Sequence, residues 1–232
     1  SQWDLMHRDM CVMVDRGDSI VGARSKLDAH RFDRTRNGSG DGLLHRAFSV
    51  FVFDSADRLL LQRRADCKIT FPNCWTNTCC SHPVTGIEPS EVDDASNVVL
   101  GQVPGIKWAA RRKLEHELGI PIDTFDHEDL KFLTRILYCA PSDDGVWGEH
   151  ELDYCLVSRA PSNMRLDPNP EEIGEVMWAT REQVADMTSD PNLKFSPWFS
   201  KIHSHFLLSW WSDLQATLFT NAHEDFSTVH EL

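Results

Sequence analysis

The 232-residue sequence has little tyrosine, few basic residues and no long apolar segment. It contains 2 tyrosines, and its 23 lysines and arginines are outnumbered by 36 aspartates and glutamates, for a formal net charge of −13. An acidic chain of this kind lacks the general positive field that holds nucleic acid. No apolar run approaches the roughly 20 residues that a membrane-spanning helix needs. We therefore expect neither a nucleic-acid partner nor a membrane span.

The remaining composition is typical of a globular protein in a reducing compartment. Hydrophobic residues make up 41% and charged residues 25% of the chain, and its length suits one domain. Seven cysteines are an odd number in a chain too large to depend on disulfides, which indicates free thiols. The first ten residues have the pattern of neither a signal peptide nor a transit peptide. We expect the cytoplasm or, after removal of a transit peptide, a plastid.

Hydrophobic patterning predicts an α+β fold in which helices pack on a mixed sheet. Strands are expected at residues 10–14, 20–22, 47–53, 59–61, 131–139, 151–157 and 176–178. Helices are expected at residues 106–118, from 181 onward and at 197–214. Loops are expected at residues 34–42 and 70–83, with a polar surface insertion at 87–102. Beyond residue 214 the sequence predicts no element.

The loop at residues 70–83 holds the first candidate chemical group, a thiol two residues before an imidazole. Cys80 and His82 suit an acid/base pair or a pair of metal ligands, whereas an isolated cysteine is commonly a small buried hydrophobe. A structural zinc site would use Cys74, Cys79 or Cys80 with His82. The sequence lacks a second Cys-x-x-Cys or His-x3-His pair to complete such a site.

Two carboxylates form the second candidate group. Glu149 and Glu151 are separated by one residue, so in a strand both leave the same face and repel each other unless a cation or a proton lies between them. This favours metal binding or acid/base chemistry over a solvated strand edge. His30 and His45 flank the predicted loop at 34–42, but single histidines are more often packed or surface residues.

A local basic patch interrupts the acidic composition. It comprises Arg63, Arg64 and Lys68, with Lys26 as a further candidate. On its own this patch is interpreted as a solvated surface. An anionic substrate, however, would need such a cluster of cations in an otherwise acidic protein.

Residues 112–120 resemble the end of the Nudix box, Arg-Glu-apolar-x-Glu-Glu-x-Gly-apolar. Lys113 and His116 occupy two positions where that box has glutamate, and Glu117 alone remains of the acidic cluster that binds metals for diphosphate hydrolysis. The helix and its glycine turn are retained while the hydrolytic charge is depleted. This pattern predicts the Nudix architecture with a different reaction.

Four motifs together resemble the type I isopentenyl diphosphate isomerases. They are residues 42–49 (GLLHRAFS), 76–83 (TNTCCSHP), 147–154 (WGEHELDY) and 196–198 (SPW), and the resemblance extends from about residue 9 to 214. It implies one Nudix-like domain over residues 1–232, an α/β/α sandwich with its core at about 45–200. Residues 1–44 would form an N-terminal extension carrying metal and substrate residues, and 197–232 a C-terminal helix and tail.

The resemblance also implies a reaction and a site. Isopentenyl diphosphate would be isomerised to dimethylallyl diphosphate through a carbocation, with these catalytic residues: Cys80, Glu151, Tyr138 and Trp198. The implied metal ligands are His30, His45, His82, Glu149 and Glu151, with Glu117 binding a second Mg²⁺ that bridges the diphosphate. The implied substrate contacts are Lys26, Arg64, Lys68 and Ser81. Adjacent side chains in an extended segment point opposite ways, so one thiol of Cys79 and Cys80 is expected to reach the substrate.

Several interpretations remain open at this point. The family's usual metal is Mg²⁺, but three imidazoles suit Mn²⁺, iron or Zn²⁺ at least as well. Trp198 also begins the apolar stripe of the last helix, which would make it a core residue. We expect a monomer with a small-molecule substrate. The alternatives are a Nudix pyrophosphohydrolase and a non-catalytic Nudix-like binding module.

Overall fold

The computed structural model describes residues 1–32 and 41–232, so the loop predicted at 34–42 lies largely outside the described residues. Ten strands form one mixed sheet, in the path order β10-β7-β8-β3-β1-β2, with β4, β5, β6 and β9 branching from β3 and β4. The strands are β1 Met10–Val14, β2 Ile20–Ser25, β3 His45–Phe53, β4 Leu59–Arg64, β5 Trp75–Thr76, β6 Cys79–Ser81, β7 Lys131–Pro141, β8 Gly148–Arg159, β9 Ile173–Ala179 and β10 Asp225–Glu231.

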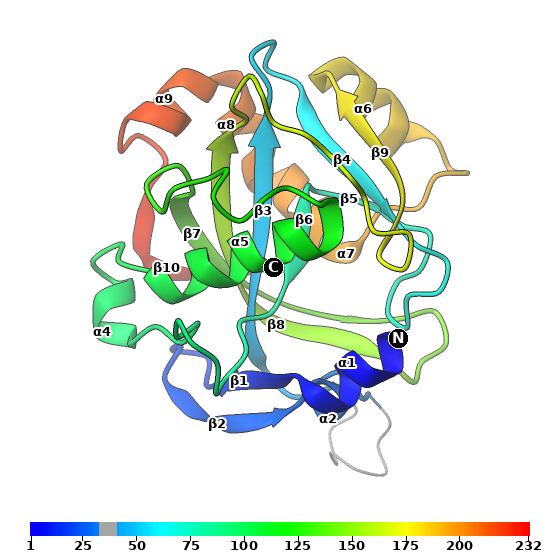
Figure 1. Cartoon of the computed structure of the whole chain (residues 1–232), viewed down its shortest axis with the longest axis vertical. Helices are drawn as coiled ribbons and strands as arrows, with labels where there is room; N and C mark the ends of the chain where they lie inside the picture. The colour runs from blue at the N-terminus through cyan, green and yellow to red at the C-terminus, as the bar shows by residue number, and fades with distance from the viewer. Residues whose placement is uncertain (33–40) are drawn as a thin grey trace.

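Helices cover both faces of this sheet (Figure 1). They are α1 Gln2–Arg8, α2 Lys26–Ala29, α4 Ala95–Val98, α5 Pro104–Leu118, α6 Arg181–Ser189, α7 Pro197–Ile202, the π-helix η1 His203–Leu207, α8 Leu208–Ser212 and α9 Leu214–Phe219. Helix α5 packs on one face, and the series from α7 to α9 packs on the other. The predicted α+β fold, with helices flanking a mixed sheet, is confirmed.

Strand β3 lies at the centre of the molecule and divides its two cores. All nine of its residues are buried. Phe48 and Val50 belong to the core beneath α5, whereas Phe51 and Phe53 belong to the core beneath the C-terminal helices. This alternation follows from the two-residue period of a strand. Because both of its faces are covered, residues 47–53 are apolar except for Ser49.

Helix α5 confirms the helix predicted at residues 106–118. The carboxylate of Asp93 accepts hydrogen bonds from the backbone N–H groups of Gly105 and Ile106, both at 2.8 Å, and so satisfies donors of the first turn. Gly119 ends the helix in the left-handed conformation, with φ 64°. A Cβ there would lie 2.4 Å from the carbonyl oxygen of Asp167. Both the left-handed backbone and this close contact therefore require glycine.

The prediction of a loop throughout residues 70–83 is wrong. Strand β5 pairs with β4, and β6 pairs with β3 through Ser49↔Cys80 and Phe48↔Ser81. These strands have two and three residues, too short for a visible alternation. They exist because distant strands supply the backbone partners.

The single helix predicted at residues 197–214 is also wrong. The segment begins as α7, passes through the π-helix η1 and α8, and breaks at Asp213 before α9. Apolar residues spaced by four drift by about 40° per step on an α-helix of 3.6 residues per turn. The wider π turn changes that phase, and Trp198, Ile202, Trp210 and Leu214 are all buried.

Two further segments differ from expectation. The insertion at residues 87–102 contains α4 and two buried carboxylates, because Asp93 caps α5 and Glu91 accepts from the Arg112 guanidinium at 2.5 and 2.8 Å. Polar composition alone predicts exposure and misses these partners. The tail forms α9 and then β10, which lies parallel to β7. Phe226 anchors this strand by stacking on Phe132 at 5.1 Å.

Candidate active site

One pocket gathers most of the predicted site residues. Its walls are formed by Lys26, Arg64, Lys68, Thr70, Cys80, Ser81, His82, Lys113, Glu117, Glu149, Glu151 and Trp198. Three other predicted residues, His30, His45 and Tyr138, have no exposed surface. Hydrogen bonds and ion pairs connect these three to the carboxylates of the cavity wall, as described below.

Strand register places the buried residues next to the cavity. His45 pairs with Glu151 in the parallel β3–β8 ladder, and Glu151 pairs with Tyr138 in the antiparallel β7–β8 ladder. The three side chains therefore lie side by side on one face of the sheet. His82 directly follows β6, and His30 ends the single turn α2, whose first residue is Lys26.

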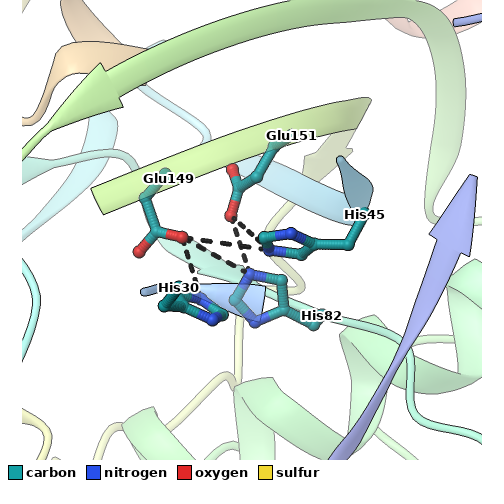
Figure 2. Close-up of side chains that lie close together, drawn as sticks. All are labelled: His30, His45, His82, Glu149 and Glu151. Carbon is teal, nitrogen blue, oxygen red and sulfur yellow. Dashed lines mark hydrogen bonds and ion pairs between the residues drawn. The ribbon is translucent and has the colours of Figure 1, made fainter. Parts of the chain in front are cut away.

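Three imidazoles and two carboxylates meet at this place (Figure 2). All five residues are buried, and their ligand atoms lie within 4.8 Å of one another. Glu149 Oε2 is 2.8 Å from His30 Nε2, and Glu151 Oε1 is 2.7 Å from His82 Nε2. His45 Nε2 lies between the two carboxylates, at 4.0 Å from Glu149 and 3.8 Å from Glu151.

The chemistry of this cluster fits a divalent metal ion. Nδ1 of His30 lies 2.7 Å from the Lys26 carbonyl, and Nδ1 of His45 lies 2.7 Å from the Leu43 carbonyl, which directs both Nε2 lone pairs inward. Within residues 1–32 and 41–232, four buried atoms of the cluster make no hydrogen bond of normal geometry: His45 Nε2, His82 Nδ1 and the closely spaced pair His30 Nε2 and Glu149 Oε2. Buried polar atoms without partners are rare. A bound cation would satisfy three of them.

The protonation states support the same conclusion. Burial lowers the pKa of His45 to about 3, and burial with the neighbouring His30 and His45 lowers the pKa of His82 well below its usual value. Both rings are therefore neutral near pH 7, the form that binds metals. Burial and the charge of Glu149 raise the pKa of Glu151 well above its usual value. A cation in the cluster would favour the ionised form of Glu151.

Glu151 also connects the cluster to Tyr138. The Tyr138 hydroxyl donates a hydrogen bond to Glu151 Oε2, while His82 occupies Oε1. Burial and the charge of Glu151 raise the pKa of Tyr138 well above its usual value. Tyr138 therefore stays protonated and acts as a hydrogen-bond donor to the carboxylate.

The two neighbouring cysteines have different surroundings. Cys80 lines the cavity, with its Sγ 3.8 Å from Nη1 of Arg64. Burial raises the pKa of Cys80 to about 12, so it is a thiol near pH 7. Cys79 is fully buried in the core beneath α5, and its thiol lies 3.6 Å from Glu117 Oε2. Of the two, Cys80 is the thiol that reaches the cavity.

Cationic side chains form another part of the cavity wall. Lys26, Arg64, Lys68 and Lys113 all line it. Glu172 lies 2.5 Å from the Lys68 ammonium, and Glu117 lies 3.1 Å from that of Lys113. Burial and the charge of Arg64 lower the pKa of Lys68 to about 8. Four clustered cations supply the ammonium and guanidinium donors that a polyanionic ligand needs.

Trp198 lies between the cavity and the core beneath the C-terminal helices. Its Nε1 donates to the Asn77 side-chain oxygen at 3.1 Å, and the Arg64 guanidinium lies 5.4 Å from its ring centroid. Trp198 is 3% exposed and packs in the core beneath the C-terminal helices. It therefore belongs to the core and to the cavity wall at once.

Sequence reasoning missed Lys113, Glu172 and Asn77 as parts of this site. Lys113 was interpreted only as the loss of a Nudix-box glutamate, although its position four residues before Glu117 on a helix predicts a contact between them. Glu172 carries no comparable signal, whereas Asn77 lies in the motif at residues 76–83, which assigns it no role of its own. Each reaches the site through a fold-level contact, Glu172 through Lys68 and Asn77 through Trp198.

Comparison with known proteins agrees with this geometry. Residues 43–199 match the NUDIX domain. The chain is 44% identical to the isopentenyl-diphosphate delta-isomerase of Schizosaccharomyces pombe, over 89% of this chain and 85% of that protein. It is 42% identical to isopentenyl-diphosphate delta-isomerase 1 of Mus musculus, over 89% of this chain and 86% of that protein. It is 41% identical to isopentenyl-diphosphate delta-isomerase II of Clarkia breweri, over 98% of this chain and 76% of that protein.

The chain belongs to the isopentenyl-diphosphate delta-isomerase family. Its fold is similar to the crystal structure of DR0079 from Deinococcus radiodurans, with a TM-score of 0.54, 18% identity, and 85% of this chain and 99% of that chain covered. Among the described residues, no helix is long and apolar enough to cross a membrane.

Proposed function

We propose that the protein converts isopentenyl diphosphate to dimethylallyl diphosphate by adding one proton and removing another. The observation that carries this proposal is a single pocket with a protonated thiol, a buried carboxyl group and a cluster of cations. The reaction adds a proton to the terminal CH₂ carbon and places positive charge on the tertiary carbon. Loss of a proton from the carbon on the diphosphate side then forms the new double bond.

Cys80 and Glu151 are the proposed proton carriers. The high pKa of the Cys80 thiol keeps a proton available in the resting protein, and Glu151 is the other group in the pocket that can hold or accept one. Tyr138 donates a hydrogen bond to Glu151 and so orients the carboxyl group. Positioned groups of this kind contribute about 10²- to 10⁴-fold each to proton-transfer rates.

Trp198 is proposed to stabilise the carbocation. Its indole ring lines the pocket that also holds Cys80 and Glu151. An aromatic face attracts a cation without acting as a nucleophile, and this attraction is strongest for tryptophan. The hydrogen bond from Nε1 to Asn77 fixes the ring in place before the charge develops.

The basic end of the pocket is proposed to hold the diphosphate. Lys26, Arg64 and Lys68 supply ammonium and guanidinium donors, and Ser81 supplies a hydroxyl or backbone donor. Charge-assisted hydrogen bonds to phosphate oxygens are among the stronger polar contacts. Anchoring the diphosphate there leaves the hydrocarbon to lie toward Cys80 and Trp198.

His30, His45, His82, Glu149 and Glu151 are the residues proposed to hold a divalent metal, with Mg²⁺ as the proposed ion. Mn²⁺ and Zn²⁺ also suit a donor set with three imidazoles. When bound, the ion supplies positive charge that lowers the pKa of Glu151 and orients its carboxylate. Glu117, which lines the same pocket, is the proposed ligand of a second Mg²⁺ that arrives with the diphosphate.

The proposal extends to the organisation of the chain. Residues 1–44 would serve as an extension that adds Lys26 and His30 to a Nudix-like core at about 45–200, with 197–232 contributing Trp198 and covering the sheet. Because one chain supplies every group of the pocket, the protein is proposed to act as a monomer. All seven cysteines are unpaired, which supports a reducing compartment such as the cytoplasm or a plastid.

The competing function is hydrolysis of a diphosphate, as in Nudix pyrophosphohydrolases. Lys113 and His116 replace two acids of the box, and the Lys113 ammonium pairs with the remaining Glu117 at 3.1 Å. Both activities are measured on one sample by incubating the protein with isopentenyl diphosphate and Mg²⁺. Chromatographic detection of dimethylallyl diphosphate without phosphate release supports the isomerase. Phosphate or pyrophosphate release without isomerisation would replace it with the hydrolase.

A further inference from the structure

A second cavity lies behind the substrate pocket, separated from it by an aromatic wall. It is an open groove and largely apolar, with Phe71, Pro141, Phe195 and Pro197 among its lining residues. Consecutive residues divide between the two spaces: Thr70 and Trp198 line the substrate pocket, whereas Phe71 and Pro197 line this apolar groove. Within the described part of the chain, the two spaces share no lining residue.

Phe71 forms this wall together with Trp198. The two rings meet edge to face, with centroids 5.5 Å apart and an interplanar angle of 83°. Phe71 has a φ of 46°, which is uncommon for a bulky residue. Arg64 holds it there, because Nε donates to the Phe71 carbonyl at 3.0 Å and Nη2 donates to the Thr70 carbonyl at 2.8 Å.

Strained backbone of this kind persists where the surroundings over-determine it, commonly at functional sites. Here the same guanidinium that lines the substrate pocket also holds the backbone that carries the Phe71 ring. The wall is therefore built as part of the site and is not an independent surface loop.

We infer that Phe71 is a specificity-determining residue that limits the length of the hydrocarbon accepted by the site. This inference rests on the proposed function. With the diphosphate held at the cations, the five-carbon skeleton ends against Trp198. A longer branch would displace Trp198 toward the space that the Phe71 ring occupies. Removing that ring opens the substrate pocket into the apolar groove, where an additional alkyl group finds an apolar environment.

The test compares isopentenyl diphosphate with 3-ethylbut-3-enyl diphosphate, which has one more methylene. The ratio of kcat/KM for the two substrates is measured for the wild type, Phe71→Ala and Phe71→Leu. One methylene in a hydrophobic pocket is worth about 10- to 200-fold in discrimination. Phe71→Ala is expected to shift the ratio toward the larger substrate by at least about tenfold. Phe71→Leu is expected to give a smaller shift in the same direction.

Phe195→Ala is the matched control. Phe195 lines the same groove, but its ring stacks on Phe199 at 5.2 Å. This variant is expected to keep the wild-type ratio, since the Phe71–Trp198 wall stays closed. An unchanged ratio in folded Phe71→Ala overturns the inference, as does an equal shift in Phe195→Ala. If Phe71→Ala does not fold, the same criterion applies to Phe71→Leu. Wild-type protein that fails to isomerise isopentenyl diphosphate would refute the proposed function itself.

Discussion

Cys79 and Cys80 are consecutive residues of β6, and their thiols lie on opposite sides of that strand. Cys79 packs in the core beneath α5, whereas Cys80 packs toward the core beneath the C-terminal helices and opens into the cavity. The pairing of β6 with β3 fixes this choice, because Cys80 is held opposite Ser49 and Cys79 opposite Val50. The backbone ladder thus decides which thiol can meet a substrate.

The first prediction separates the two thiols. Cys80→Ala is expected to lower kcat by about 10²- to 10⁴-fold, the usual contribution of a positioned proton carrier. Cys79→Ala removes a buried side chain outside the cavity, so it should reduce stability while most of the turnover remains. Steady-state kinetics and thermal unfolding of both variants check this. Equal losses of kcat in the two variants would contradict the assignment.

The second prediction concerns the metal. His45→Gln removes one inward-facing Nε2 and is expected to weaken binding of a divalent ion by at least about tenfold, measured by titration calorimetry with Mn²⁺. A chelator should lower the Tm of the wild type, because an ion bound only to the folded state stabilises it. His150→Gln is the control, since His150 leaves β8 between Glu149 and Glu151 and so faces the other way. Unchanged Mn²⁺ affinity in His45→Gln would exclude this cluster as the metal site.

The third prediction tests the altered Nudix box. Lys113→Glu restores a glutamate at the box position, but it places a negative charge in the pocket that is proposed to hold the diphosphate. Loss of one charge-assisted contact is worth about 1.5–3 kcal/mol, so KM for isopentenyl diphosphate should rise by at least about tenfold. Lys113→Arg should retain a KM near the wild-type value. A Lys113→Glu variant that gains phosphate release with an unchanged KM would show that this lysine does not contact the substrate.

The fourth prediction concerns a buried charge network beneath the N-terminal hairpin. Asp18 is fully buried and accepts from Arg46 Nε at 2.7 Å, from Arg135 Nη1 at 2.8 Å and from the Tyr154 hydroxyl. Asp18→Asn leaves two arginines without their counter-ion and is expected to cost about 3–5 kcal/mol in the free energy of unfolding.

Chemical denaturation measures this cost, with Asp15→Asn as the control in the same turn. Asp15 is exposed, and its Oδ1 accepts from the backbone N–H groups of Gly17 and Ser19 at 2.9 Å, which an asparagine oxygen can also do. The control should change stability by about 0.5 kcal/mol or less. A loss below about 1 kcal/mol in Asp18→Asn would mean that the network contributes little to holding the hairpin on the sheet.

The sequence predicts the parts of the fold that depend on local periodicity. The apolar spacing of α5 and its glycine end at Gly119 are visible without a structure, as is the pair Glu149 and Glu151 on one face of a strand. The π-helix η1 and strand β10 are not visible, because each is fixed by packing against distant strands and not by a local pattern.

Local periodicity does not predict which residues form the site. His45 and Glu151 are 106 positions apart, and only the parallel register of β3 and β8 makes them neighbours. The family resemblance of the motifs around these two residues predicts that they share one site. It did not supply Lys113, Glu172 or the wall formed by Phe71, whose contacts follow from how the loops and helices close around the pocket.

The central claim is that a proton from an exchangeable group adds to the substrate as another proton leaves it. Incubation of the protein with isopentenyl diphosphate and Mg²⁺ in deuterated water, followed by NMR, tests this directly. The expected product is dimethylallyl diphosphate with deuterium in the methyl group derived from the terminal CH₂ carbon, with no release of phosphate. Product without deuterium, or an unchanged substrate, would contradict it.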